Sequence, residues 1–236
     1  MIIATNVTKQ FGTLKALNNV SVTCNAGECI ALIGPNGSGK TTLIKSFLGM
    51  VVPDSGFITY NKSNILHNWK YRENIGYMPQ IGKYPDNMTI GQVFTMMKDI
   101  RQCKSIPDTY LYEQYAVDNL LHKRMGTLSG GTRQKVSACL AFLFNPSVLI
   151  LDEPTAGLDP FAAEILKQKI IEEKQKGKLI LITSHVLSEL DDVVTQVIYM
   201  QDGQLCFHQS LKNVQAITGE TKLAKAIAHI MKKNQL

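Results

Sequence analysis

Two glycine-rich turns in the sequence have the residue types and the setting to bind an anion. One reads GPNGSGKT at residues 34–41 and the other reads LSGGTRQK at residues 128–135, and a stretch of helical character follows each. A glycine turn exposes backbone N–H groups, and the N-terminus of a helix adds a partial positive charge. A chain with a single phosphate site would need only one such turn, so the second turn requires an explanation.

The first turn fits the pattern G-x-x-x-x-G-K-[ST], and it lies between an apolar strand at residues 29–33 and a helix, as this pattern requires. Backbone N–H groups of the turn would surround the phosphates, Lys40 would reach the β- and γ-phosphates, and the Thr41 hydroxyl can bind Mg²⁺. A chance glycine turn is the alternative, which the strand–loop–helix order disfavours. The predicted nucleotide-binding residues of this loop are Gly34, Pro35, Asn36, Gly37, Ser38, Gly39, Lys40, Thr41 and Thr42.

Two adjacent carboxylates follow another apolar strand, at residues 148–151. Asp152, at the end of that strand, is predicted to hold Mg²⁺, usually through water. Glu153 is placed to accept a proton from the water that attacks the γ-phosphate. Its alternative role is a structural carboxylate that caps the next turn. The pair favours a hydrolase over a protein that only binds nucleotide.

The motifs that would indicate GTP in place of ATP are incomplete. The guanine-binding pattern N-K-x-D needs an acid at its last position, and NKSN at residues 61–64 ends in Asn64. No D-x-x-G follows the phosphate loop either. A GTPase is therefore disfavoured.

The composition is that of a folded globular protein, with 44% hydrophobic and 19% charged residues in a chain of 236. The net charge of +6 suits an anionic ligand, an anionic membrane surface or a nucleic acid, and does not choose among them. No apolar stretch is long enough to span a bilayer, and no secretory signal opens the chain, so we expect a soluble protein, cytoplasmic if bacterial. Five cysteines without a C-x-x-C pair are predicted to be free thiols in a reducing compartment: Cys24, Cys29, Cys103, Cys139 and Cys206.

The order of the apolar runs predicts an α/β fold. Solid apolar strands at residues 29–33, 148–151 and 179–185 alternate with helical stretches, which is typical of a parallel sheet covered on both faces. We expect a P-loop NTPase core with a parallel sheet, an N-terminal antiparallel β subdomain, and a helical insertion subdomain at about residues 85–140. This ATPase domain would span residues 1–208.

The remaining residues, 209–236, would form a short basic C-terminal helical tail. They contain five lysines and one acid, Glu220, and LAKAIAHIM at residues 223–231 has helical periodicity. A solvated terminal helix is favoured over a membrane-binding helix.

Taken together, the motifs resemble those of the nucleotide-binding subunit of an ABC (ATP-binding cassette) transporter. An LSGG turn just upstream of an apolar strand ending in Asp-Glu is far more specific for that family than the phosphate loop alone. The resemblance covers the chain to about residue 207. The motifs that carry it, in order, are GPNGSGKT, Gln80 at the end of a strand, LSGGT, LILDEP at residues 149–154, AGLD at residues 156–159, and His185.

The resemblance supplies a reason for the second turn. In that family the LSGG turn, here Ser129, Gly130 and Gly131, contacts ATP bound to the opposite subunit. Two cassettes enclose two ATP molecules head to tail, and a two-fold homodimer makes both sites complete. Each glycine turn would then be half of a site.

Further residue roles follow from the resemblance by position. Phe11 resembles the aromatic residue that stacks on adenine, although a lone aromatic in a strand could equally be a core residue. Gln80 resembles the glutamine that contacts Mg²⁺ and the attacking water and links the core to the helical insertion, which would carry the contact surface for a membrane subunit. Asp159 resembles the aspartate that reaches across the dimer interface, and His185 resembles the histidine that contacts the γ-phosphate. Thr132 departs from the family pattern, where glutamine is commoner.

A single cassette without a membrane span implies a separate transmembrane permease subunit, with this chain peripheral on the inner face of the cell membrane and no nucleic acid partner. The segment from Ile75 to Phe94 resembles cassettes of the ABC-2 exporter-like group, and residues 128–160 resemble those of copper-processing systems for nitrous-oxide reductase maturation. Met96, Met97, Cys103 and His67 lack metal-site spacing and are not predicted to bind copper.

Two other hypotheses remain open. A soluble ABC protein of translation or DNA repair usually has two cassettes or a long coiled-coil insertion, and neither is present here, although the basic charge fits it. A regulatory ATP-binding module with little hydrolysis is disfavoured by Glu153 and His185. The leading hypothesis is an ATPase whose hydrolysis cycle drives a transporter.

Overall fold

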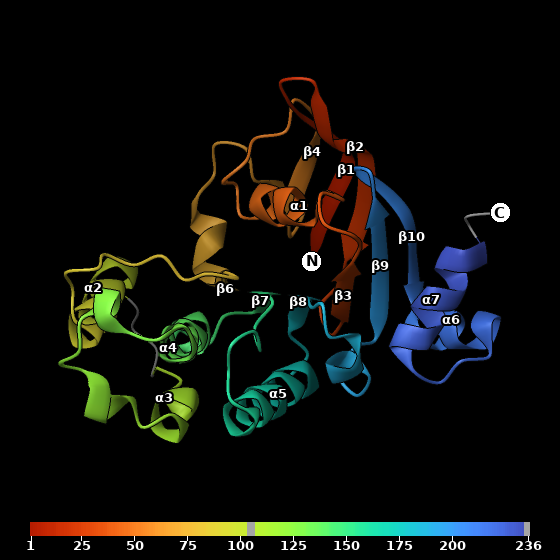
Figure 1. The fold of residues 1–236 in the computed structure, drawn as a ribbon. Helices are drawn as coiled ribbons and strands as arrows, with labels where there is room; N and C mark the ends of the chain where they lie inside the picture. The colour runs from red at the N-terminus through yellow and green to blue at the C-terminus, as the bar shows by residue number, and fades with distance from the viewer. Residues whose placement is uncertain (103–106, 234–236) are drawn as a thin grey trace. The chain divides into compact units, whose positions relative to one another are not determined.

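The computed structural model describes residues 1–102 and 107–233, so Cys103 and its predicted thiol lie outside the described residues. The chain divides into two compact units (Figure 1). The first is formed by Met1–Arg72 with Leu179–Leu236, and the second by Glu73–Lys178. The first unit therefore contains both ends of the chain, and the second is the segment between them.

An antiparallel sheet opens the first unit and confirms the predicted N-terminal β subdomain. Its strand order is β2-β1-β4-β5. Along the second half of β2, the buried residues Val20, Val22 and Cys24 alternate with exposed hydroxyl residues, as in a strand with one buried face. The strands are β1 (Ile2–Phe11), β2 (Leu14–Cys24), β4 (Ser55–Tyr60) and β5 (Ser63–Asn64).

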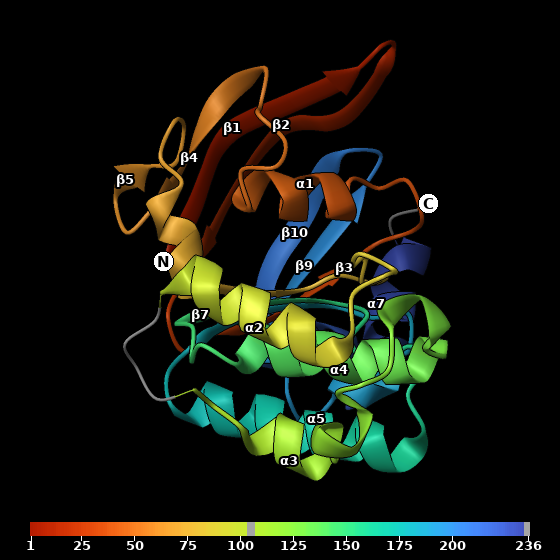
Figure 2. The ribbon, with the colours of Figure 1, turned by 90° about the vertical axis from the view of Figure 1, so that its left-hand side faces the viewer.

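A second set of strands in the first unit holds the phosphate loop. In it, β8 (Leu179–Thr183), β3 (Cys29–Ile33) and β9 (Gln196–Gln201) run parallel, and β10 (Gln204–Ser210) pairs antiparallel with β9. Every residue of β3 and β8 is buried, which explains their uninterrupted apolar sequences. Helix α1 (Lys40–Phe47) follows β3 and lies between the antiparallel sheet and the strands β3 and β9 (Figures 1 and 2).

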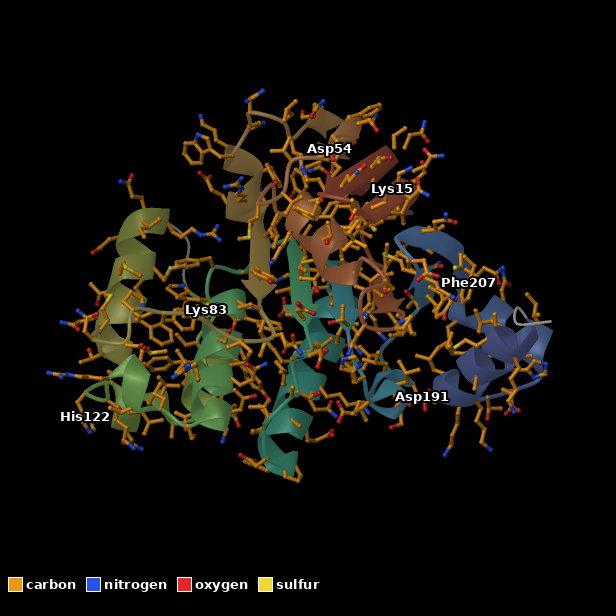
Figure 3. All side chains as sticks on the ribbon, turned by 45° about the horizontal axis from the view of Figure 1, so that its top comes forward. Lys15, Asp54, Lys83, His122, Asp191 and Phe207 are labelled. Carbon is orange, nitrogen blue, oxygen red and sulfur yellow. The ribbon has the colours of Figure 1, made fainter. Side chains whose placement is uncertain are left out.

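The C-terminal tail is more closely packed than the sequence indicated. It forms α6 (Leu211–Thr218) and α7 (Leu223–Lys233), and the latter packs on the short 3-10 helix η4 (Leu187–Leu190). The backbone N–H of Leu223 donates to the Asp191 carboxylate at 2.8 Å, and Figure 3 places Asp191 beside these helices. Leu223, Ala226 and Ile227 are buried. Only the lysine-bearing face of the predicted solvated helix is exposed, because its apolar face covers η4.

The second unit contains one pair of parallel strands and most of the helices. Residues of β6 (Ile75–Met78) pair in parallel with those of β7 (Val148–Asp152). A Cβ added to Gly76 would lie 2.0 Å from the Ala141 carbonyl oxygen, so only glycine lets the helix carrying Ala141 approach β6 this closely. The helices of this unit are α2 (Ile90–Arg101), α3 (Tyr110–Gln114), η2 (Val117–Leu120), η3 (Met125–Thr127), α4 (Gly130–Phe142) and α5 (Pro160–Gln175), and η1 (Lys70–Asn74) precedes β6.

The helices α2 and α5 begin at side-chain caps. Thr89 and Gln92 form a reciprocal capping box at the start of α2. Asp159 caps α5, whose first residue is Pro160, and Gly177 follows its end with φ +79°. This helix is the helical stretch expected between the apolar strands at residues 148–151 and 179–185.

The described cysteines are free thiols, as predicted. Three of them, Cys24, Cys29 and Cys139, are buried, and Cys206 is exposed. Burial raises the pKa of the Cys24 thiol to about 12 and also raises the pKa of Cys139. These two thiols are therefore protonated and unreactive at neutral pH.

A buried cluster of charges fastens the end of α5. The Glu173 side chain is fully buried and bonds Lys176 at 2.9 Å and Lys169 at 3.0 Å, and it also contacts Lys178. Lys169 is itself buried and bonds Asp108 at 2.5 Å. Burial alone would raise the pKa of Glu173, but the three lysines outweigh it and lower that pKa to about 2. The carboxylate therefore stays charged inside the protein.

The charge of Glu173 should make stability depend on pH. Its pKa falls from 4.5 to about 2 on folding, so its contribution is present above pH 4.5 and is lost as the pH falls from there toward 2. Glu173→Gln leaves Lys169 buried beside a neutral group and should lower the free energy of unfolding by about 3 kcal/mol at pH 7. Urea unfolding at pH 7 and at acid pH measures both effects.

Glu164→Gln is the matched control, because Glu164 is exposed on the same helix. It should change the free energy of unfolding by less than about 0.5 kcal/mol. Equal effects of the two substitutions would show that the buried cluster contributes nothing to stability.

Candidate functional site

The phosphate loop in the first unit is fixed by close backbone contacts. Gly39 has φ +100°, and a Cβ there would lie 2.4 Å from the Ala16 carbonyl oxygen. A Cβ on Gly34 would lie 2.1 Å from the Met200 carbonyl oxygen. Any other residue at these two positions would push the loop away from β2 and β9. The glycines of the motif therefore hold the loop backbone in one place before a ligand binds.

Lys40 lies across this loop. Its ammonium donates to the Gly34 carbonyl at 2.7 Å and to the Pro35 carbonyl at 2.9 Å. Gly39, at the N-cap position of α1, has no side chain to accept from the first N–H groups of the helix. Thr41 in the first turn is exposed. A positive side chain, open helix N–H groups and a hydroxyl thus gather at one helix N-terminus, which suits a polyphosphate.

Ser38 plays a different part from its neighbours in the loop. Its side chain is buried, and its hydroxyl has no hydrogen-bond partner among the residues that the structure describes. A Cβ on Gly34 would lie 2.6 Å from that hydroxyl oxygen, so the serine side chain packs beneath the loop. Its backbone N–H donates to the Pro35 carbonyl at 3.2 Å. Ser38 therefore shapes the loop from inside.

Two further predicted residues of the first unit lie on exposed chain. Phe11, the last residue of β1, is 50% exposed, which rules out the alternative that it is a core residue. The ammonium of Lys9 lies 5.4 Å from the centroid of its ring. His185 is exposed two residues beyond β8, in a turn where the Ser184 hydroxyl accepts from the Val186 N–H at 2.9 Å. Both side chains are thus exposed to solvent.

Parallel pairing brings three predicted residues of the second unit to one end of the strands. Met78 of β6 pairs with Leu151 of β7, and the two strands run in the same direction. Gln80 follows β6, and Asp152 and Glu153 follow Leu151, so all three emerge at the carboxyl end of this strand pair. Asp152 is 8% exposed, whereas Gln80 is exposed.

Glu153 has an unusual backbone. Its φ is +51°, in the left-handed region, which costs a non-glycine residue about 1–3 kcal/mol. Its carbonyl oxygen accepts from the Ala156 N–H at 3.1 Å and from the Gln134 side-chain amide at 3.2 Å. The surrounding contacts therefore hold the predicted catalytic carboxylate in a conformation that it would not adopt by itself.

The second glycine turn begins α4, as predicted. The Ser129 hydroxyl accepts from the Thr132 N–H at 3.3 Å and lies 2.9 Å from the Thr132 hydroxyl. Thr132, which stands where the family commonly has glutamine, thus completes the helix cap. Gly130 is exposed, and a Cβ on Gly131 would lie 2.7 Å from the Gly157 carbonyl oxygen. The turn presents backbone N–H groups outward while it packs on the loop after β7.

Asp159 has two partners within its own unit. One carboxylate oxygen accepts from the Ala162 N–H at 2.9 Å, and the other bonds the Lys135 ammonium at 2.7 Å. The bond to Lys135 is the largest cause of the lowered pKa of Asp159. The loop that ends in Asp159 is therefore tied to α4.

Sequence reasoning missed two residues of this region, Gln134 and Lys135. Both lie early in α4, and both bond the segment that follows β7. The one signal available was a glutamine beside the apolar face of the predicted helix, which reads QKVSACLAF. A buried polar side chain on such a face needs a partner, but the sequence does not name that partner.

The oxygen donors among the predicted residues fit Mg²⁺. Thr41 offers a hydroxyl, Asp152 a carboxylate and Gln80 an amide oxygen, and hard oxygen ligands are those that Mg²⁺ prefers. Within the described residues, no three His, Cys, Asp or Glu side chains form a ready-made metal site.

Comparison with known proteins places this arrangement in a family. The sequence profile described as ABC transporter matches residues 17–156, which include the phosphate loop, the LSGG turn and both carboxylates. The chain belongs to the ABC transporter family. A profile for an AAA domain also matches residues 124–191.

Curated relatives agree with the cassette assignment. The chain is 33% identical over 207 residues to the Nod factor export ATP-binding protein I of Burkholderia lata, with 84% of this chain and 67% of that protein covered. It is 30% identical over 214 residues to the lipopolysaccharide export system ATP-binding protein LptB of Haemophilus influenzae, with 87% and 88% covered. The chain thus spans about two thirds of the length of the first relative and most of the second.

Solved structures agree on the fold. An ATP-binding subunit of an ABC transporter superposes with a TM-score of 0.89 at 25% identity, covering 98% of this chain and 99% of that one. A dimeric bacterial ABC transporter cassette gives a TM-score of 0.79 at 23% identity, covering 89% and 99%. The predicted α/β cassette fold is confirmed, and the chain is an ATP-binding ATPase of this family. No helix in the described part of the cassette is long and apolar enough to cross a membrane.

The exposed ring of Phe11 gives a test of adenine stacking. Phe11→Ala should raise the Kd for ATP about tenfold, because stacking of a base on an aromatic ring contributes roughly 1–3 kcal/mol. Phe11→Tyr should retain tight binding. Titration with a fluorescent ATP analogue measures the affinity. Phe57→Ala, at a similarly exposed ring of the same sheet, is the control, and equal affinities of the two alanine variants would exclude Phe11 from the adenine site.

Proposed function

We propose that this cassette is the ATP-hydrolysing subunit of a transporter whose membrane-spanning part is a separate permease, and that two copies of the chain enclose two ATP molecules head to tail. The observation that carries the proposal is that each unit contains a glycine turn at the start of a helix. The phosphate loop precedes α1, and the Ser129 turn precedes α4. Two anion-binding turns in one chain are explained if each completes a site with the other turn of a second copy.

In this proposal the predicted residues divide the binding of ATP among them. Lys40 and the loop N–H groups bind the β- and γ-phosphates, and Phe11 stacks on adenine. His185 contacts the γ-phosphate, and the turn of Ser129, Gly130 and Gly131 binds the γ-phosphate held by the second copy. Asp159, at the end of the loop packed against that turn, lies at the interface between copies.

Hydrolysis then depends on a few oxygen ligands and one base. Thr41, Asp152 and Gln80 would hold Mg²⁺, which when bound neutralises charge on the phosphates. Glu153 accepts a proton from the attacking water, and Gln80 helps to orient that water. The left-handed backbone of Glu153 sets where its carboxylate points. Catalysis of this kind is mainly positional and electrostatic.

Glu153→Gln should stop turnover and trap the ATP-bound dimer. Loss of the general base should lower kcat at least about 100-fold while ATP binding persists. Light scattering of this variant should show a monomer without nucleotide and a dimer with Mg-ATP. Turnover unchanged from that of the parent chain would show that Glu153 is not the base.

The second substitution Ser129→Arg provides the matched control for the trans site. It places a long cation on the second turn without altering the phosphate loop of the same chain, so ATP should still bind but the dimer should not form. A Ser129→Arg variant that dimerises as well as its parent would contradict the head-to-tail arrangement.

Exposed apolar side chains suggest where the permease makes contact. The helical segment predicted at residues 85–140 remains our first proposal for that surface, and Ile100 on α2 is exposed there.

The first unit adds a second candidate surface, a pocket of about 280 Å³ whose lining includes Leu66, Trp69 and Arg72. Its rim has exposed apolar side chains, and its lining has Arg72 and His67 but no carboxylate. An amphipathic cytoplasmic helix of the permease, with one large apolar anchor and an acidic residue, fits this pocket.

Trp69→Ser and Ile100→Ser separate the two surfaces. Each should leave the basal ATPase activity of the isolated chain unchanged, and each should lower permease-stimulated activity about tenfold if its side chain is an anchor of the interface. Activity in reconstituted vesicles measures both. A loss for Ile100→Ser alone would exclude the pocket, and no loss for either would place the permease elsewhere.

The transported cargo is the most specific part of the proposal. The relatives named above are export ATP-binding proteins for Nod factor and lipopolysaccharide, which supports an exporter. The motif resemblance to copper-processing cassettes supports a role in nitrous-oxide reductase maturation. In either case the chain would lie on the inner face of the cell membrane, held there by its permease.

A further inference from the structure

Gln134 is a buried polar residue to which the proposed function gives no role. It lies in the second turn of α4, and its side chain is 5% exposed. The side-chain amide nitrogen donates to the Glu153 carbonyl at 3.2 Å and to the Pro154 carbonyl at 3.4 Å. One NH₂ group thus bonds two successive backbone carbonyls directly after β7.

These bonds hold a residue whose backbone conformation is unfavourable. Glu153 has φ +51°, and its carbonyl oxygen has two donors, the Gln134 amide and the Ala156 N–H at 3.1 Å. The backbone N–H bond closes the local turn, whereas Gln134 attaches that turn to another element. Without the amide, the backbone of Glu153 could relax toward a more favourable φ. The carboxylate of Glu153 would then point elsewhere.

The same helix carries the second glycine turn. Ser129 caps α4, and Gln134 follows five positions later on the same rigid helix. Gly131 packs against the Gly157 carbonyl, and Lys135 bonds Asp159. The first turns of α4 therefore touch the loop from Glu153 to Asp159 at its start, middle and end.

We propose that Gln134 is a positioning residue that holds Glu153 in its catalytic orientation and joins it mechanically to the LSGG turn. The inference rests on the proposed function, in which Glu153 is the base and the turn binds the ATP of a second copy. Movement of the turn on nucleotide binding is then transmitted through α4 to the base of the same chain. Each ATP site would in this way influence hydrolysis at the other.

The test separates positioning from general stability. Gln134→Met has nearly the same shape and no donor, and it should lower kcat roughly 10- to 100-fold, since small displacements of a catalytic group have effects of this size. The Kd for ATP should change less than about threefold, because the Gln134 side-chain amide bonds the Glu153 and Pro154 carbonyls and not a predicted phosphate ligand. The double variant that combines Gln134→Met with Glu153→Gln should still form the ATP-dependent dimer, which light scattering measures.

The control is Thr218→Val. It removes another buried hydrogen bond, from the Thr218 hydroxyl to the Val214 carbonyl at 2.8 Å, and keeps the shape of the side chain. It should leave kcat within about twofold of the parent. Gln134→Glu is the second variant in case Gln134→Met does not fold, because its carboxylate keeps the shape and repels both carbonyls. It should lower kcat in the same way.

The possible results are distinct. A selective loss of kcat in either Gln134 variant supports the positioning role. A kcat equal to that of Thr218→Val, or parallel losses of kcat, ATP affinity and melting temperature, would overturn it. If Glu153→Gln alone retains turnover, the assignment of Glu153 as the base in the proposed function fails whatever Gln134 does, so the two failures cannot be confused.

Discussion

The close approach of glycine backbones to neighbouring carbonyl oxygens is the constraint on which both glycine-rich turns depend. An added Cβ would lie 2.1 Å from a carbonyl oxygen at Gly34, 2.4 Å at Gly39 and 2.7 Å at Gly131. Each contact fixes a turn against a strand or loop behind it, so that its N–H groups face outward. The turns are therefore shaped before any phosphate is bound, and little conformational entropy remains to be lost on binding. Substitution at these glycines would move the backbone and, with it, every donor of the turn.

Buried parallel strands decide where the other chemical groups lie. All residues of β3, β7 and β8 are buried, and each strand is followed directly by a polar or glycine-rich segment. In the first unit β3 leads to the phosphate loop and β8 to His185. In the second unit β7 leads to Asp152 and Glu153, and the adjacent parallel strand β6 leads to Gln80. A strand that is apolar throughout has no other place for functional side chains than the residues at its end.

The sequence was informative where one local rule decided the structure. The apolar run at Cys29–Ile33, bounded by the glycine loop, is a strand with those limits, and Asp159, Pro160 and Gly177 mark the ends of α5. The exposure of Phe11 and the packing of α7 on η4 depend on distant parts of the chain, and periodicity alone cannot supply them. Gln134 is the clearest case, because its partners lie beyond the rest of α4 and the whole of β7. In the sequence, Gln134 looks like an ordinary polar residue of a helix. Its role becomes visible only when the structure shows the left-handed backbone of Glu153.

The unfavourable backbone conformation of Glu153 requires contacts that hold it in place. A left-handed glutamate at the end of a buried strand would relax if the loop were free, so its conformation has to be imposed by contacts from outside the strand. One contact that helps to impose it comes from α4, whose tip is the turn of Ser129. Because of this contact, the backbone geometry of Glu153 depends on the position of α4 and its turn. If Glu153 is the base and the turn binds the ATP of a second copy, as we propose, the geometry of the base at one site depends on the occupancy of the other.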